Sequence, residues 1–303
     1  MYAILEKRKM TENTDLMVIE APEVARKAMP GQFIIVRKDE FSERIPLTIA
    51  DFDRERGTVT IIFQKVGKST YELAELNTGD YVRNFVGPLG VASEITNYGS
   101  VVLVAGGVGI APVYPIARAL HEAGNQVTVI LGARSANLLF WVEKMRAISD
   151  HLVICTDDGT LGRKGVVTEP LREYLQKGGV ARVWAIGPAV MMKFCCKTTA
   201  EFQTPTVVSL DSIMVDGTGM CGACRVEVGG ETRFVCVDGP EFDGNKVNWD
   251  VVLSRKKIFV AEEKQAMESW NNEQASRHVC NLNQEVLKQE IGSTRRVESA
   301  AAD

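Results

Sequence analysis

One aspartate and three cysteines in the last third of the chain have the types and spacing of a metal–sulfur site. Asp216, Cys221, Cys224 and Cys236 follow the pattern D-x4-C-x2-C-x11-C. Thiolates hold iron–sulfur clusters, and the plant-type pattern is C-x4-C-x2-C with a distant fourth cysteine. The spacing therefore predicts a 2Fe-2S cluster with a carboxylate in the first ligand position, which is a signature of electron transfer.

Other chemistries remain open for these cysteines. Structural zinc sites are usually four-coordinate with nitrogen or sulfur ligands, but no histidine is near, and His278 and Cys280 are remote in sequence. Ordinary free thiols are a further possibility, whereas a disulfide framework does not suit a chain of this size without a secretory signal. Glycines between the cysteines favour the cluster, because backbone N–H groups must come close to its sulfurs.

A second group of residues suits the binding of phosphate. Gly106, Gly107, Val108, Gly109, Ala111 and Pro112 follow an apolar run and precede a helical pattern. Glycines let the backbone approach an anion, and the helix N-terminus supplies unpaired N–H donors. The pattern is not G-x-G-x-x-G, so a tight strand-to-helix turn is the alternative. Gly187, Pro188 and Met191 follow a later strand and join the same site if both strands end at one edge.

The first third of the chain offers two more candidate anion sites. Arg44, Pro46, Leu47 and Thr48 place a cation, a rigid kink and a hydroxyl on one strand, and an arginine fork suits a pyrophosphate. Gly67, Lys68, Ser69 and Thr70 offer successive N–H groups and hydroxyls at a helix start. Taken singly, Arg44 is also explained as a surface charge and Thr48 as an ordinary strand residue.

The elements that position these residues change along the chain. Short β-branched runs over residues 1–96 predict a closed antiparallel barrel, and alternating strands and helices over 97–205 predict a doubly wound parallel sheet. Residues 206–252 form a small turn-rich domain around the cysteines. Residues 253–303 are a polar, mostly helical extension that could contact a partner, and we expect 295–303 to be disordered.

Composition limits the class of protein. The chain has 303 residues, 45% of them hydrophobic, with a net charge of −4. The charge argues against nucleic acid as a partner, and no apolar run is long enough for a membrane span. Seven cysteines without a signal sequence fit a reducing cytoplasm.

The order of barrel, nucleotide sheet and 2Fe-2S unit resembles the ferredoxin-NADP reductase superfamily, and most of all the electron-transfer subunit of dihydroorotate dehydrogenase. The resemblance covers residues 1 to about 250 and includes Thr156-Asp157-Asp158-Gly159-Thr160 and Cys236-Val237-Asp238-Gly239-Pro240. It implies that Arg44, Pro46, Leu47 and Thr48 line FAD, with residues 67–70 on its diphosphate. It also implies that residues 107–112, Asp157, Asp158, Gly187, Pro188 and Met191 shape a nicotinamide nucleotide site.

The dihydroorotate-type subunit has four cysteines at the cluster positions, whereas this chain has Asp216 at the first of them. A chain with aspartate at this position resembles the small subunit of NADH-dependent ferredoxin:NADP oxidoreductases. Those subunits work as heterodimers with a larger flavin and iron–sulfur subunit. This resemblance implies a subunit that exchanges hydride with NAD(H) and single electrons with that partner, and with ferredoxin through the complex. A dihydroorotate dehydrogenase subunit is the alternative function, and a colourless regulatory module that binds a nucleotide or zinc is a third.

The nucleotide preference rests on the resemblance, which implies NAD(H). Arg134 and Ser135 follow the second strand of the expected sheet, where a cation and a hydroxyl suit the 2′-phosphate of NADP. The adjacent pair Cys195 and Cys196 is assigned no role. The sequence leaves open the physiological direction, the partner's identity and whether the complex bifurcates electrons.

Overall fold

The computed structural model describes residues 1–274. Residues 1–258 form one unit and residues 259–303 a second, whose described part is helical over 260–274. The extension expected to be disordered at 295–303 lies outside the described residues. The elements of the first unit are β1 (Tyr2–Thr11), β2 (Thr14–Glu20), α1 (Pro22–Lys27), β3 (Phe33–Arg37), β4 (Ile45–Asp53), β5 (Thr58–Gln64), α2 (Lys68–Ala74), β6 (Tyr81–Val82), β7 (Asn84–Leu89), β8 (Ser100–Gly106), η1 (Gly107–Gly109), α3 (Ile110–Glu122), β9 (Gln126–Ala133), η2 (Ala136–Leu138), α4 (Val142–Arg146), β10 (His151–Thr156), β11 (Arg163–Lys164), α5 (Thr168–Lys177), β12 (Val180–Ile186), α6 (Ala189–Ala200), β13 (Thr206–Ser209), β14 (Arg225–Val228), β15 (Glu231–Phe234), α7 (Val235–Asp238), β16 (Glu241–Asp243) and α8 (Trp249–Arg255).

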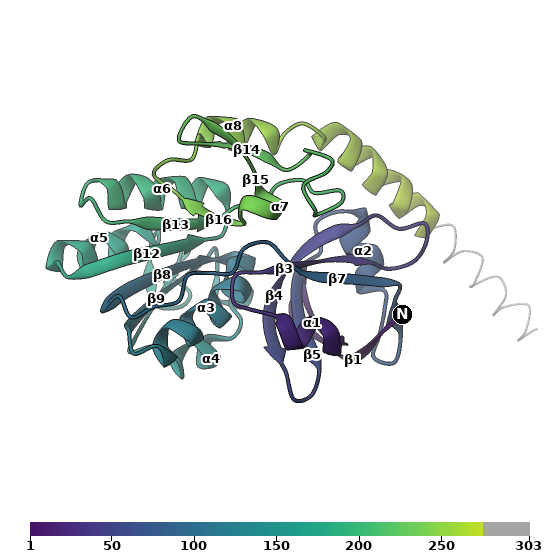
Figure 1. Ribbon diagram of the computed structural model, residues 1–303, viewed down its shortest axis with the longest axis horizontal. Helices are drawn as coiled ribbons and strands as arrows, with labels where there is room; N and C mark the ends of the chain where they lie inside the picture. Colours follow the sequence, from purple (N-terminus) through teal and green to yellow (C-terminus); the bar gives the residue numbers. More distant parts are fainter. Residues whose placement is uncertain (275–303) are drawn as a thin grey trace, which may run out of the picture. The chain divides into compact units, whose positions relative to one another are not determined.

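The N-terminal strands form a nearly closed antiparallel barrel. Their order in the sheet is β6-β1-β2-β5-β4-β3-β7, and the two edge strands are separated in the chain by Arg83 alone. Figure 1 labels β1, β3, β4, β5 and β7 of this barrel, together with α1 and α2. The Arg83 N–H donates to the carbonyl oxygen of Arg37 at 3.0 Å, which ties the connection between the two edge strands to the end of β3. Side chains of alternate strand residues, such as Ile34 and Val36 of β3 and Ile49 of β4, fill the interior. The predicted barrel is confirmed.

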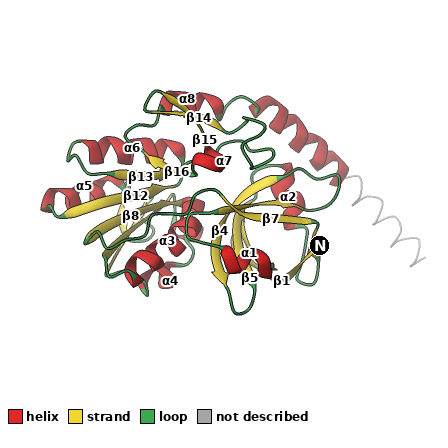
Figure 2. Ribbon diagram, viewed as in Figure 1, coloured by secondary structure: helices red, strands yellow, loops and turns green. Residues whose placement is uncertain are grey.

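The second sheet is parallel and covered by helices on both faces. Its order is β11-β10-β9-β8-β12-β13-β16, with only β16 antiparallel. Successive residues of a strand point to opposite faces, so Leu103 of β8 packs in the core with α3, and Val104 in the core with α5 and α6. Figure 2 shows α3 and α4 on one face and α5 and α6 on the other. The predicted doubly wound sheet is confirmed.

The region around the cysteines is built onto this sheet. β13 pairs with β12 and β16 pairs with β13, so residues 206–209 and 241–243 continue the nucleotide sheet. Between them the chain leaves the sheet to form a loop, the β14–β15 hairpin and α7. The boundary expected after residue 205 therefore falls immediately before a strand of the same sheet.

Helix α8 packs against α6 and against β14 of the cysteine region. The Asn248 side chain caps it by accepting from the Val251 N–H at 3.2 Å, and Trp249 and Val252 are buried. The boundary expected after residue 252 lies inside this helix. Among residues 1–274, no helix is long and apolar enough to span a membrane.

Candidate functional site

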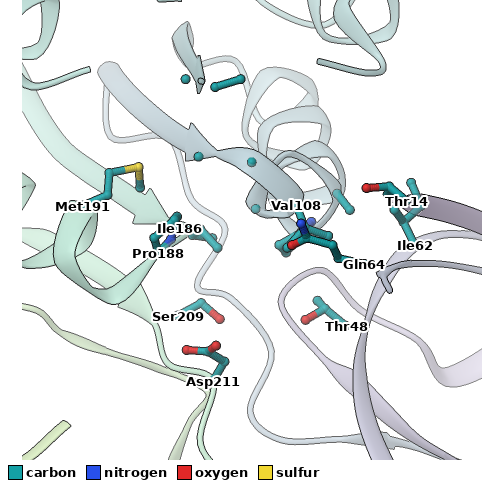
Figure 3. Close-up of a pocket in the computed structure, with 18 of the residues that line it drawn as sticks. Thr14, Thr48, Ile62, Gln64, Val108, Ile186, Pro188, Met191, Ser209 and Asp211 are labelled. Carbon is teal, nitrogen blue, oxygen red and sulfur yellow. The ribbon is translucent and has the colours of Figure 1, made fainter. Parts of the chain in front are cut away.

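A cavity of about 1030 Å³ lies between the barrel and the carboxyl ends of the parallel strands. Figure 3 shows Thr48 and Gln64 of the barrel on one side, and Pro188, Met191 and Asp211 on the other. The residues predicted from sequence that line this cavity are Pro46, Leu47, Thr48, Thr70, Gly106, Gly107, Val108, Gly109, Ala111, Pro112, Arg134, Asp157, Gly187, Pro188 and Met191. The fold therefore brings together segments more than 140 positions apart in the sequence.

The glycine-rich turn after β8 must pack closely against the end of β12. A Cβ atom built on Gly109 would lie 2.2 Å from the carbonyl oxygen of Ile186. Gly107 has a φ of +56°, a conformation that most residues avoid. Glycine is needed at Gly109 for space and at Gly107 for conformation. The turn leads directly into α3, whose residues Ala111 and Pro112 line the cavity.

The helix start at α2 has the hydrogen bonding expected of an ordered turn. Thr70 Oγ1 accepts from the N–H groups of Val66 and Gly67 at 3.0 and 3.1 Å and donates to the Gly67 carbonyl at 2.8 Å. Thr70 and Val66 line the cavity, whereas Gly67, Lys68 and Ser69 do not. Ser69 instead donates to Glu43.

Two further predicted residues also lie off the cavity. Arg44 is exposed at the start of β4. Asp158 is exposed, and its carboxylate accepts from the N–H and hydroxyl of Thr160 at 3.0 and 2.7 Å. These hydrogen bonds, the side-chain bond first, lower the pKa of Asp158. Asp158 therefore shapes the turn after β10, while its neighbour Asp157 lines the cavity.

The structure adds cavity residues that the sequence reasoning missed. Ser209 is the last residue of β13, Asp211 and Ser212 follow that strand, and Thr14 and Gln64 come from barrel strands. The signal for the first group was available, because ligands in parallel sheets bind at the carboxyl ends of strands and β13 is such a strand. No local pattern marks Thr14 or Gln64, which reach the cavity through the closure of the barrel.

The four predicted cluster ligands lie on one loop system in two pairs. Cys221 Sγ is 3.4 Å from Asp216 Oδ1, and Cys224 Sγ is 3.2 Å from Cys236 Sγ. Asp216 also accepts from the N–H groups of Thr218, Met220 and Cys221 at 3.1–3.2 Å. Cys221 is exposed and Asp216 is half-buried, whereas Cys224 and Cys236 are buried.

This arrangement fits a two-iron cluster better than a single ion. Within residues 1–274, no three His, Cys, Asp or Glu side chains gather around one point that could hold a metal ion. A structural zinc ion takes four ligands around one point, whereas the four candidates lie in two pairs. A 2Fe-2S cluster takes about two protein ligands on each iron, which matches the two observed pairs. His278 and Cys280, the remote zinc candidates, lie outside the described residues.

Burial favours the protonated form of Cys236 in the cluster pair and of two cysteines outside it. Burial, followed by the hydrogen bond to Cys224, raises the pKa of Cys236 to about 12, so metal binding must displace its proton. Burial likewise raises the pKa of Cys195, and it raises that of Cys196 to about 12. Both are buried on α6, far from solvent, as inert thiols are.

The cysteine region and the nucleotide sheet each match a known protein family. Residues 211–248 match the iron-sulfur cluster binding domain of dihydroorotate dehydrogenase B, and residues 103–197 match the oxidoreductase NAD-binding domain. The first match covers all four cluster candidates, and the second covers the glycine-rich turn and Met191.

Individual relatives extend the similarity over most of the chain. The chain is 49% identical to a dihydroorotate dehydrogenase B (NAD(+)) electron transfer subunit homolog of Thermotoga maritima, over 88% of this chain and 94% of that protein. It is 52% identical to an uncharacterized protein of Clostridium beijerinckii, over 88% of this chain and 93% of that one. A structure of the NADH-dependent reduced ferredoxin-NADP oxidoreductase, studied for flavin-based electron bifurcation, matches with 48% identity and a TM-score of 0.84, covering 89% of this chain and 98% of that chain. The family resemblance expected from the motifs is confirmed.

Proposed function

Because the chain belongs to the family of dihydroorotate dehydrogenase B electron-transfer subunits, we propose that it carries FAD and a 2Fe-2S cluster and passes electrons between NAD(H) and a larger partner subunit. It is a subunit of an oxidoreductase. The observation that carries the proposal is the shared cavity, because one space is lined by the flavin candidates of the barrel and the nucleotide candidates of the sheet.

The residues of the cavity have separable tasks. Pro46, Leu47 and Thr48 would hold the flavin ring, and Thr70 would stand near its diphosphate. The backbone of the glycine-rich turn, where Gly107 and Gly109 line the cavity, would hold the nucleotide phosphates. When bound, the flavin supplies the conversion between hydride transfer and single-electron transfer. The mainly apolar walls, such as Phe33, Val108 and Met191, exclude water from the space between the two ligands.

We propose NAD(H) as the nucleotide. Arg134 at the end of β9 lines the cavity and would suit a 2′-phosphate, but Asp157 at the end of the neighbouring strand lines it too. A carboxylate accepts a hydrogen bond from a ribose hydroxyl and repels a phosphate, which supports NAD(H). Comparison of half-saturation by NADH and NADPH tests this choice, and a clear preference for NADPH would reverse it.

The partner would dock beside the cluster loop. Val215, Met220 and Val237 are 54%, 89% and 43% exposed, next to the candidate ligands Asp216, which is half-buried, and Cys221, which is exposed. Exposed apolar side chains around a redox site favour a protein interface. We propose a heterodimer with a larger flavin and iron–sulfur subunit, with ferredoxin as its outer electron partner, working in the cytoplasm.

A dihydroorotate dehydrogenase subunit is the second candidate, and the names of the relatives favour it. Asp216 favours the ferredoxin:NADP type, because its carboxylate, rather than a thiolate, stands beside Cys221. The large subunit that co-purifies with the native protein separates the two candidates.

The proposal is tested by anaerobic titration of the purified full-length chain with NADH, followed by visible absorption. We expect yellow-brown protein with about two irons per chain, and bleaching of both the flavin and cluster bands. A flavin that bleaches over an unchanged remainder would refute the electron-transfer route.

Paired variants locate the cluster. Cys236→Ala should purify without the cluster bands but with flavin, because it removes one ligand of the buried pair. Cys195→Ala is the matched control, since it also removes a buried thiol but lies on α6. Equal iron content in the two variants would contradict the assignment of Cys236.

A further inference from the structure

Two arginines hold successive carbonyl groups of the short segment between Cys221 and Cys224. Arg225 Nη1 donates to the Gly222 carbonyl oxygen at 3.2 Å, and Arg255 Nη2 donates to the Ala223 carbonyl oxygen at 2.8 Å. The two come from opposite sides in sequence, since Arg225 opens β14 and Arg255 ends α8. Neither was singled out by the cluster spacing as a site residue.

The carbonyl contacts determine the direction of the amide groups. In a trans peptide the C=O and the following N–H point in opposite directions. The N–H groups of Ala223 and Cys224 therefore point away from the two guanidinium groups. Within residues 1–274, the N–H groups of Gly222, Ala223 and Cys224 donate to no protein acceptor. Backbone N–H groups without acceptors beside two cysteines are the donors that cluster sulfurs use.

Arg255 is the better placed of the two to act by charge. It is half-buried, while Arg225 is exposed. No carboxylate of the described part of the chain forms an ion pair with Arg255, whereas the next residue, Lys256, pairs with Asp211 at 2.5 Å. Buried Trp249 and the Asn248 cap fix α8, so the guanidinium is held at the loop by a rigid element.

We propose that Arg255, assisted by Arg225, is a positioning residue that aims the Ala223 and Cys224 amides at the cluster and raises its reduction potential. The inference rests on the proposed 2Fe-2S function. One-electron reduction adds one negative charge at the site, and a nearby fixed cation with oriented amide dipoles stabilises that charge. A unit charge within about 10 Å changes such an equilibrium constant by roughly tenfold at an effective dielectric constant near 20.

The test is a mediated redox titration of the full-length protein, with dithionite as reductant and the electron paramagnetic resonance signal of the reduced cluster as readout. Arg255→Met should lower the reduction equilibrium constant about tenfold, which is about 59 mV for a one-electron couple. Arg255→Lys, which keeps the charge but loses the fork, should lower it less. Lys256→Met is the matched control, because it removes a neighbouring charge that touches no loop carbonyl, and should change the constant less than about threefold.

Each outcome decides the inference. A wild-type potential in Arg255→Met, or a shift no larger than that of Lys256→Met, overturns it. If Arg255→Met purifies without iron, Arg255→Gln is measured in its place, and its reduction equilibrium constant should also fall about tenfold. A wild-type potential in Arg255→Gln overturns the inference. Loss of iron from both variants, with flavin retained, would show that Arg255 only holds the loop and would refute the role in potential. Absence of a cluster from the wild-type protein would instead refute the proposed function.

Discussion

Replacing Gly109 by alanine tests the close packing between the glycine-rich turn and the end of β12. The added Cβ would lie 2.2 Å from the Ile186 carbonyl oxygen and 2.9 Å from the Gly187 Cα. Normal separation of such atoms is about 3.5 Å, so two backbone segments must move apart by roughly 1 Å. Both contacts are with backbone atoms, which cannot move aside as the end of a flexible side chain can. The strain is therefore relieved only by a shift of the backbone.

Two opposing free-energy contributions determine whether Gly109→Ala stabilises or destabilises the fold. Gly109 has a φ of −60°, so alanine adopts its conformation without strain. Alanine would by itself gain up to about 1 kcal/mol over glycine at a helical position. Overpacking costs about 1–3 kcal/mol, so we expect Gly109→Ala to lower the free energy of unfolding by about 1–2 kcal/mol. It should also weaken NADH binding about tenfold, since loss of one charged hydrogen bond to phosphate costs about 1.5 kcal/mol.

Urea denaturation and half-saturation of flavin bleaching by NADH measure the two effects. Gly67→Ala is the control for stability, because a Cβ there meets no atom within 4 Å. Its loss should be about 1 kcal/mol or less, from the weaker helix cap alone. A Gly109→Ala protein with wild-type stability and wild-type NADH half-saturation would refute the packing argument.

Substitutions at Asp216, Asp51 and Glu241 have defined outcomes, and Glu201→Gln serves as a control. Asp216→Cys should retain a cluster with a changed potential and Asp216→Ala should weaken or lose it; iron content and visible spectra unaffected by Asp216→Ala would contradict its role as a ligand. Asp51→Asn removes the carboxylate that accepts from Arg118 at 2.8 Å and Lys144 at 3.1 Å between the barrel and the nucleotide domain, and should cost about 1–3 kcal/mol in urea denaturation. Glu201→Gln removes one partner of the surface ion pair with Arg172 and is its control; we expect a smaller loss of stability than for Asp51→Asn, because surface pairs contribute little. Burial raises the pKa of Glu241 above its ordinary value of 4.5, although Ser93, Trp184 and Arg182 oppose this. The folded state therefore binds the Glu241 proton more tightly, so stability falls as pH rises from 4.5 through the folded pKa; Glu241→Gln should flatten that fall, and an unchanged pH profile would count against it.

The candidate cluster residues and the fold class could be predicted from the sequence because their signals are local. The D-x4-C-x2-C spacing places Asp216, Cys221 and Cys224 on one short loop whatever the rest of the fold does. Strand alternation and the change to a strand–helix rhythm after residue 97 depend on burial of nearby residues, so they predicted the barrel and the parallel sheet.

Contacts between distant segments could not be read in the same way. The sequence around Arg255 does not indicate its hydrogen bond to the Ala223 carbonyl, 32 positions earlier. That contact depends on the positions of β13 and β16 in the sheet, which set where the loop and α8 lie. Likewise, closure of the barrel brings Thr14 and Gln64 to a cavity shared with Met191. Residue types and spacing identified which chemistry the chain carries, but tertiary packing decided which donors, charges and walls surround it, because those depend on long-range contacts that leave no periodic trace in the sequence.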